Sequence, residues 1–493
     1  MNEGEILLVA GLLLSAGLAA AKAADRVRVP GLLLFLALGM LIGSEGLGGV
    51  DFSDAELTRT LGTIALVLIL FEGGLAAGWG EIRPVIGIAV SLAFIGTIVT
   101  ATIAGLAAYW LFDLSLLEGL IIGAAVAATD SAAIFAVLRG STLRRRLARA
   151  LEGESGLNDP IALLLVTGFI EWIRDPGYGL LDMAVTLSSK LAIGLGIGYA
   201  VGWAARWAFR NLDLPSPGLY PVASIATMTL AFGLSEVAYG SGFLGVYVAG
   251  LVLGTGTVPA RGTTVAFHQG LSWVAQISLF ALLGLLVFPS GLGDVALQGL
   301  LLSAVLIFLA RPVAALAATA FADFDVRERL MLGWAGLRGA IPIWLATFPV
   351  IEGVANADVI FNTIFFVVVT STLIQGATFE PLAKRLGLTG EEPALPRTLI
   401  ETGIIRRLGG ESVVHRVRKG DAAVGHLVKE LELPREALVN VIVRGDSAIP
   451  PRGSTGIEAG DEIHVIARME ALEQVQALTE RWRGGPIGKP PLP

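Results

Sequence analysis

The 493-residue sequence has no cysteine and only four histidines, and each shortage excludes a class of site. Without cysteine the chain forms no disulfide, has no thiol nucleophile and cannot bind a metal through sulfur. Three of the histidines lie after residue 390, so a histidine-based metal site is not expected in the first 390 residues. Nothing in the composition points to a resident cofactor or to a nucleic-acid partner.

Charged residues are also scarce, at 16% of the chain, against about 25% in soluble domains. Hydrophobic residues make up 54% and the mean hydropathy is +0.74, values typical of a membrane protein. The last 103 residues differ, because they hold 29 of the 77 charged side chains (35 basic and 42 acidic). We therefore predict a membrane domain over residues 1–390, a soluble domain over residues 391–480 and a disordered tail over residues 481–493.

Thirteen apolar runs are predicted to span a membrane, which takes about 20 residues per helix. These runs cover residues 6–24, 30–43, 57–71, 84–112, 117–138, 151–172, 184–207, 220–237, 242–254, 267–288, 295–320, 330–348 and 360–386. Arginine and lysine occur in alternate connections, so the positive-inside rule places the N-terminus outside and the soluble domain in the cytoplasm. The predicted fold is a polytopic α-helical membrane protein with a small α+β domain at its C-terminal end.

An odd number of spans with one in the middle predicts two six-helix halves of opposite orientation. The fifth and twelfth spans occupy matching positions, and both are interrupted, at Ala128-Thr129-Asp130-Ser131 and within residues 336–342. Interrupted helices at matching positions mark the binding site of many transporters. Asp130 is suited to begin a half-helix as its N-cap. We expect Arg338 to complement the C-terminal end of the first half of the twelfth span.

The sixth span begins with a dense group of polar residues, from Glu152 to Pro160. Residues four apart on a helix share a face, so Ser155 and Asp159 point the same way. Pro160 has no N–H, which leaves a carbonyl one turn earlier free to bind another group. A charge at membrane depth costs about 2.5–3.5 kcal/mol, so we expect these carboxylates to have a use. We predict that they face the interruption at Asp130.

Four segments in chain order resemble the motifs of the cation/proton antiporter family, specifically the bacterial sodium- or potassium-proton exchangers with an asparagine-aspartate pair. The segments are Phe71-Glu72-Gly73-Gly74-Leu75, Ala128-Thr129-Asp130, Glu154-Ser155-Gly156-Leu157-Asn158-Asp159 and Gly336-Leu337-Arg338-Gly339-Ala340. This resemblance covers nearly all of the membrane domain. It implies a homodimer in the lipid of a bacterial plasma membrane, with a core bundle that moves against a dimerisation region.

The same resemblance implies roles for individual residues. The cation would be held by Asp159, Ser155, Asp130 and the backbone carbonyl of Thr129. Asn158 either touches the cation or holds the broken helices together. Glu154 and Arg338 would form a buried structural ion pair, and Glu72 is either an interfacial charge or part of a cytoplasmic funnel. Many family members have proline where this chain has Ser131, which leaves the extent of unwinding at this break open.

Apolar patterns in the soluble domain predict strands over residues 413–417, 438–443, 448–452 and 462–467 and helices over residues 424–431 and 470–478. The segments Ile449–Gly453 and Gly460–Ile463 resemble the TrkA-C (RCK-C) regulatory domain of potassium channels and transporters. That resemblance implies dimerisation and a regulatory nucleotide, and it favours potassium over sodium as the cation. The three histidines, His415, His426 and His464, are expected to be solvated.

We therefore predict an electroneutral antiporter, not an enzyme, in which Asp159 takes either a proton or a cation. Burial favours the protonated form of a carboxylate and a bound cation favours the ionised form, so the two compete. A sodium/proton antiporter of the same family and a regulated cation channel are alternatives, although the sequence has no repeated filter-like loop. An intramembrane aspartyl protease is a further alternative, but neither Asp130 nor Asp159 lies in a Tyr-Asp or Gly-x-Gly-Asp setting.

Overall fold

The computed structural model describes residues 3–27, 31–130, 133–134, 142–212, 214–255, 258–390, 410–445 and 447–487. The chain divides into two compact units, residues 1–397 and 398–493, and each is described by itself. The predicted boundary at Glu391 and the residue Ser131 lie outside the described residues.

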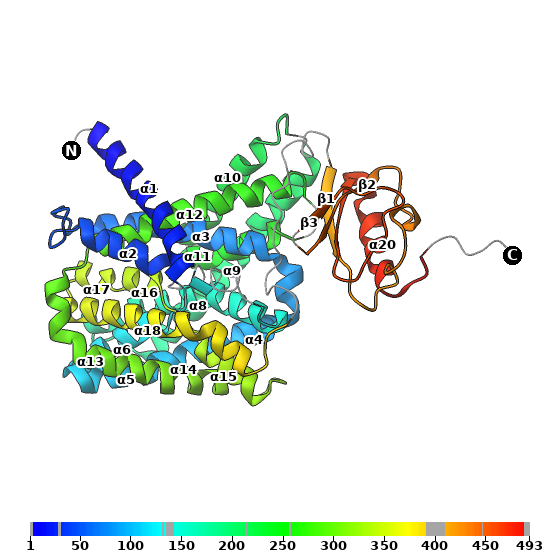
Figure 1. Cartoon of the computed structure of the whole chain (residues 1–493). Coiled ribbons are helices and arrows are strands. Elements are labelled where there is room, and N and C mark those ends of the chain that lie inside the picture. Colours follow the sequence, from blue (N-terminus) through cyan, green and yellow to red (C-terminus); the bar gives the residue numbers. More distant parts are fainter. Residues whose placement is uncertain are drawn as a thin grey trace. The chain divides into compact units, whose positions relative to one another are not determined.

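The first unit is a bundle of apolar helices (Figure 1). Its helices are α1 (Glu3–Val27), α2 (Gly31–Ile42), α3 (Ala55–Ile82), α4 (Ile86–Ser91), α5 (Thr97–Phe112), α6 (Leu116–Ala127), α8 (Arg145–Arg174), α9 (Leu180–Asn211), α10 (Leu219–Val237), α11 (Gly242–Leu253), α12 (Arg261–Leu285), α13 (Leu292–Val305), α14 (Arg311–Ala318), α15 (Val326–Trp334), α16 (Ala340–Leu345), α17 (Thr347–Ile351) and α18 (Ala357–Arg385). Among the described residues, six helical stretches are long and apolar enough to cross a membrane, and five further apolar helices are shorter.

Both predicted interruptions are confirmed. Helix α6 ends at Ala127, and residues 128–130 are not helical. Helix α15 ends at Trp334 and α16 begins only at Ala340, with five non-helical residues between them. Each break therefore exposes backbone groups inside the bundle, where they need partners because water is absent.

Two π-helical turns accompany the two breaks. The turn η2 (Leu92–Gly96) lies between α4 and α5, in the helical segment that comes before α6, the helix that ends at the first break. The turn η4 (Leu306–Ala310) lies between α13 and α14, in the helical segment that comes before α15, the helix that ends at the second break. Such turns are rare and often occur at functional sites. Their recurrence gives the two segments the same local pattern.

Glycines let helices of the first unit approach closely. A side-chain carbon added to Gly123 of α6 would lie 2.1 Å from the carbonyl oxygen of Ala101 on α5. One added to Gly198 of α9 would lie 2.4 Å from the carbonyl oxygen of Gly245 on α11. Backbones that touch through small residues are typical of packing between membrane helices.

The second unit is a four-stranded antiparallel sheet with the order β1-β4-β2-β3. Its strands are β1 (Gly410–Arg416), β2 (Ala437–Arg444), β3 (Ser447–Ile449) and β4 (Glu462–Arg468). Helix α20 (Leu472–Gly484) packs on the sheet through Val475 and Trp482, which are buried with Val465 of β4. The prediction of a disordered tail from residue 481 is wrong in part, because α20 runs to Gly484 and buries Trp482.

The predicted helix over residues 424–431 is also wrong. Residues 424–427 are not helical, and only the short 3-10 turn η5 (Val428–Glu430) forms there. Gly425 has a φ of 86°, in the left-handed region that glycine adopts without strain. This glycine turns the chain where the apolar pattern suggested that a helix continues.

Candidate functional site

Asp130 links the two breaks through backbone hydrogen bonds. Its N–H donates to the carbonyl of Leu337 at 2.9 Å, and its Oδ2 accepts from the N–H of Ala340 at 2.9 Å. Its Oδ1 accepts from the N–H of Ala133 at 3.1 Å, which is the N-cap that the sequence predicts. Asp130 therefore caps two helical segments, the one that contains Ala133 and the one that begins at Ala340. A side-chain carbon at Gly339 would lie 1.6 Å from Oδ2, so this position requires glycine.

Arg338 binds the C-terminal end of a helix, whereas Asp130 caps N-terminal ends. Its Nη1 donates to the carbonyls of Ala127 at 3.0 Å and Ala128 at 2.9 Å, where α6 stops. A cation at the C-terminal end of a helix complements its negative dipole. The predicted role is correct in kind, but it was assigned to the wrong helix, because Arg338 neutralises the break in the fifth span and not that in its own.

The predicted ion pair between Glu154 and Arg338 is wrong. Glu154 Oε1 accepts instead from Nη1 of Arg311 at 2.8 Å, and both side chains are at most 2% exposed. Arg311 begins α14, directly after the second π turn. Arg338 is engaged by the carbonyls of α6, which explains why a different arginine serves Glu154. The sequence contains a signal for it, because Arg311 is the single charged residue in the predicted span of residues 295–320.

Three side chains join α8 to the first break. Nδ2 of Asn158 donates to Oγ1 of Thr129 at 2.6 Å, and the Oγ1 of Thr129 lies 2.9 Å from the Oγ of Ser155. All three side chains are buried. Asn158 thus holds the broken helix against α8, which is one of the two roles predicted for it. The Ser155 hydroxyl thus meets the first break from the same face of α8 that carries Asp159 one turn further on.

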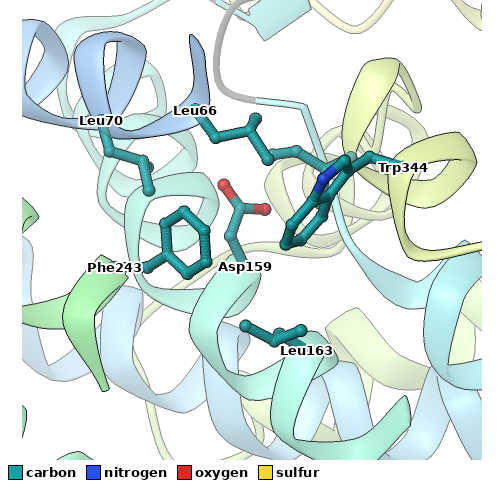
Figure 2. Close-up of a pocket in the computed structure, with 7 residues that line it drawn as sticks. Leu66, Leu70, Asp159, Leu163, Phe243 and Trp344 are labelled. Atoms are coloured by element: carbon teal, nitrogen blue, oxygen red, sulfur yellow. The ribbon is translucent and has the colours of Figure 1, made fainter. Parts of the chain in front are cut away.

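Asp159 is buried, but its carboxylate has no hydrogen-bond partner among the described residues. The side chain is 5% exposed, and neither Oδ1 nor Oδ2 is hydrogen-bonded. It points into a small cavity of about 10 Å³ (Figure 2), close to the minimum that one water molecule requires. The cavity is lined by Leu66, Leu70, Leu163, Phe243, Ile341 and Trp344. Asp130 is near enough for the two charges to interact.

A buried carboxylate without partners is costly, because its ionised form has lost its water without gaining hydrogen bonds. Two species satisfy such a group, a bound proton or a bound cation. Cation sites of transporters often use the carbonyls of an unwound helix, and the hydroxyl of Ser155, one turn before Asp159 on α8, meets Thr129 of the first break. Among the described residues there is no group of three or more histidines, aspartates or glutamates that would hold a multivalent metal ion.

A second group of charges lies toward the N-terminal end of α8. Glu152 Oε2 accepts from Nη1 of Arg149 at 2.5 Å, and Arg149 also contacts Glu81 of α3 at 3.1 Å. Glu152 and Arg149 are buried, so the carboxylate of Glu152 is held by this arginine, a partner that the sequence analysis does not name. Glu72 of α3 is buried as well, at 6% exposure, which disfavours a simple interfacial charge. Its place in a cytoplasmic funnel stays a prediction.

In the second unit the expectation of solvated histidines fails at two positions. His415 and His464 are 3% and 4% exposed. His415 Nε2 lies 3.2 Å from Asp421 Oδ2, and its ring packs edge-on against Trp482. Burial lowers the pKa of both histidines below the usual value. Both are therefore neutral at physiological pH.

Comparisons with known proteins give two matches to family models. Residues 12–385 match the transmembrane domain of the sodium/hydrogen exchangers. Residues 413–479 match the TrkA-C domain. The first match includes every residue of the site described above, and the second covers the sheet and most of α20.

Individual proteins agree with these matches. The chain is 35% identical to the K(+)/H(+) antiporter NhaP2 of Shewanella baltica over 474 residues, covering 96% of this chain and 82% of the relative. It is 34% identical to the K(+)/H(+) antiporter NhaP of Alkalimonas amylolytica over 477 residues, covering 96% and 83%. The solved structure of the sodium proton antiporter MjNhaP1 from Methanocaldococcus jannaschii has the same fold, with a TM-score of 0.68 at 24% identity over 78% of this chain and 99% of that one.

Proposed function

Because this chain belongs to the sodium/hydrogen exchanger family, we propose that it is an antiporter that exchanges a monovalent cation for protons, with potassium preferred over sodium. The observation that carries this proposal is the buried carboxylate of Asp159, whose oxygens have no partner among the described residues. No covalent step is involved, so the chain acts as a transporter and not as an enzyme. The preference for potassium is supported by the names of the two relatives and by the TrkA-C domain.

The cation is bound by Asp159 together with oxygens from the first break. Ser155 and Thr129 present hydroxyls there, and the backbone carbonyl of Thr129 belongs to non-helical chain. Asp130 supports the site by fixing both breaks and adds negative charge nearby. Asn158 keeps Thr129 in place through its amide. Each ligand therefore comes from a part of the chain that the breaks hold in a defined position.

Exchange follows from competition at Asp159. The protonated carboxyl has no charge to hold a cation, and the ionised carboxylate holds one. One proton then replaces one cation, and Asn158 stands where a second acid would allow a second proton. The exchange is therefore electroneutral. Alternating access requires the site to face each side of the membrane in turn.

For the whole membrane domain we propose thirteen spans arranged as two inverted six-helix halves around a middle span. The two breaks and the two π turns at equivalent places support this arrangement. The N-terminus lies outside, and the second unit lies in the cytoplasm, as the loop charges indicate. The protein forms a homodimer in the lipid of a bacterial plasma membrane.

The second unit regulates exchange and does not transport. Its sheet and helix form their own buried core around residues such as Ile442, Val465 and Trp482, as expected of a separate domain. A small nucleotide is the proposed regulator. A chain truncated after residue 390 keeps its exchange activity in vesicles but loses the response to added nucleotide. Complete loss of exchange by a correctly inserted truncation contradicts this role.

Reconstituted vesicles test the function directly. A potassium gradient imposed across the membrane should drive proton movement of opposite direction, read from a pH-sensitive dye, whether or not the membrane potential is clamped to zero. Sodium and lithium should drive it less well at equal concentration. A cation flux that follows the voltage and needs no proton movement would instead identify a channel, which is the alternative from a different class.

A further inference from the structure

Next to the site lies a larger cavity to which nothing above assigns a role. It has a volume of about 240 Å³ and lies between α8 and α9. Its lining combines apolar and polar side chains: Leu164, Thr167, Gly168, Glu171, Tyr178, Met183, Thr186, Leu187 and Lys190. We call this space the α8–α9 cavity.

The α8–α9 cavity contains two opposite charges that do not neutralise each other. Neither Glu171 nor Lys190 forms an ion pair with any residue that the structure describes. Lys190 is ten residues into α9, so it lies about 15 Å along the helix from its start. An ionisable residue that deep in a membrane helix is expensive, and one that faces a cavity is a candidate for a transport path.

One face of α8 connects this cavity to Asp159. Asp159, Leu163, Thr167 and Glu171 follow one another at intervals of four residues, so they form a stripe along the helix. Asp159 and Leu163 line the small cavity of the site, while Thr167 and Glu171 line the α8–α9 cavity. Leu163 is therefore the residue of this stripe between Asp159 and the part that lines the α8–α9 cavity. In Figure 2 Leu163 lies below Asp159, whose carboxylate points the other way, toward Leu66 and Leu70.

A backbone hydrogen bond from α9 also connects the α8–α9 cavity to the surroundings of Asp159. The N–H of Ser241 donates to the carbonyl of Lys190 at 2.9 Å, which fixes the start of α11 beside Lys190. Phe243, two residues further on, lines the small cavity with Asp159. The Lys190 end of the α8–α9 cavity is thus close to the site.

We propose that the α8–α9 cavity is the vestibule through which the transported cation reaches Asp159 from the side of the membrane where α8 ends and α9 begins. This inference rests on the proposed antiport, and that side is the non-cytoplasmic one in the proposed orientation. Glu171 attracts the cation, since a cleft with negative charge raises the local concentration of cations. Lys190 limits how long the cation stays, because a path conducts only if binding is weak enough to allow release. Leu163 is the barrier in the conformation described.

The absence of cysteine from the chain permits a direct test of access. Thr167→Cys and Thr186→Cys place a thiol on each wall of the vestibule. Leu165→Cys is the matched control, because Leu165 lies on α8 at the same level but lines a neighbouring apolar cavity with Phe169 and Trp172, which shares only Met183 and Leu187 with the α8–α9 cavity. A membrane-impermeant cationic thiol reagent added on the side where α8 ends should label both threonine variants and not the control. Equal labelling of all three, or none of the threonine variants, overturns the proposal.

Kinetics then test the roles of the two charges. Glu171→Gln should raise the apparent KM for potassium added on that side by about threefold to tenfold, with little change in kcat, and Lys190→Gln should lower the same KM. Neither should change the KM for potassium added on the other side. Asp182→Asn is the matched control, because Asp182 is exposed near the start of α9 and accepts from Gly179 without lining the cavity. Changes of equal size from both sides, or no change in either variant, overturn the proposal.

Labelling needs no transport, so its result is independent of the antiport activity itself. If the threonine variants fail to label while exchange persists, the vestibule is wrong and the antiport proposal stands. If they label while no variant or wild type exchanges cations for protons, the antiport proposal is wrong and the cavity is an aqueous space with another use.

Discussion

Asp130 and Asp159 are two aspartates buried in one membrane domain, and their surroundings are opposite. Asp130 is 2% exposed and accepts backbone hydrogen bonds from two helix ends. Asp159 is 5% exposed and accepts none from the described residues. A carboxylate that the backbone already satisfies holds structure together. A carboxylate left without partners is available for a ligand that comes and goes.

Asp159→Asn is the change with the largest expected effect on exchange. An amide cannot release a proton and binds a cation weakly, so exchange in vesicles should fall below detection. Folding should persist, and the unfolding temperature should stay the same or rise, because the desolvation cost of the buried charge disappears. Vesicle assays and thermal unfolding of the purified variant measure the two effects. Robust exchange by this variant would mean that Asp159 is not the group that binds the proton and the cation.

Breaking the ion pair of Glu154 with Arg311 should have the next largest effect, which is a loss of protein stability. Removing one partner strands a buried charge, at a cost of about 3–5 kcal/mol. Arg311→Gln and Glu154→Gln should therefore each lower the yield of folded protein and its unfolding temperature, and the double variant should be more stable than either. A double variant as unstable as the sum of the two single changes would contradict their pairing.

Asp130 should behave as a structural group. Asp130→Ala removes two helix caps, at about 1 kcal/mol each, whereas Asp130→Asn keeps an oxygen that can accept at one cap. We expect the alanine variant to unfold at a lower temperature and the asparagine variant to keep part of its exchange activity. Loss of exchange by Asp130→Asn as complete as that of Asp159→Asn would mean that both aspartates bind the cation directly.

The smallest expected effect is the contribution of the buried His415 to the pH dependence of the stability of the second unit. Burial lowers its pKa in the folded state, so the unfolded state, with a pKa of about 6.5, binds more protons as the pH falls. The stability of this unit should therefore be highest above pH 7 and decrease as the pH drops below about 6.5. Hydrogen exchange of β1 and α20 in the full chain, at pH 7.5 and pH 5.5, measures this change. His415→Gln should make it smaller, and a pH dependence that is unchanged in this variant contradicts the account.

Much of this arrangement follows from sequence. Composition indicates the membrane domain, and the interruptions at Thr129-Asp130 and residues 336–340 follow from polar and glycine residues inside apolar runs. The position of Asp159 follows from its spacing to Ser155 on one helix face. These features are local, so short-range rules apply to them.

Partners across the bundle did not follow from sequence. Arg311 and Arg338 are both single cations in predicted spans, and only the three-dimensional packing decides which of them reaches Glu154. The π turns η2 and η4 leave no composition signal, because their residues are as apolar as their neighbours. In the second unit the helix predicted over residues 424–431 does not form, because Gly425 has a positive φ that an α-helix does not allow.

The central claim is that one carboxylate, Asp159, holds either the proton or the cation. The most direct test is the apparent KM for potassium in reconstituted vesicles, measured at a series of pH values from about 9 to about 5. Competition predicts that this KM rises with proton concentration, approaching about tenfold per pH unit once the carboxyl is mostly protonated. A KM that stays constant across the whole range would contradict the account.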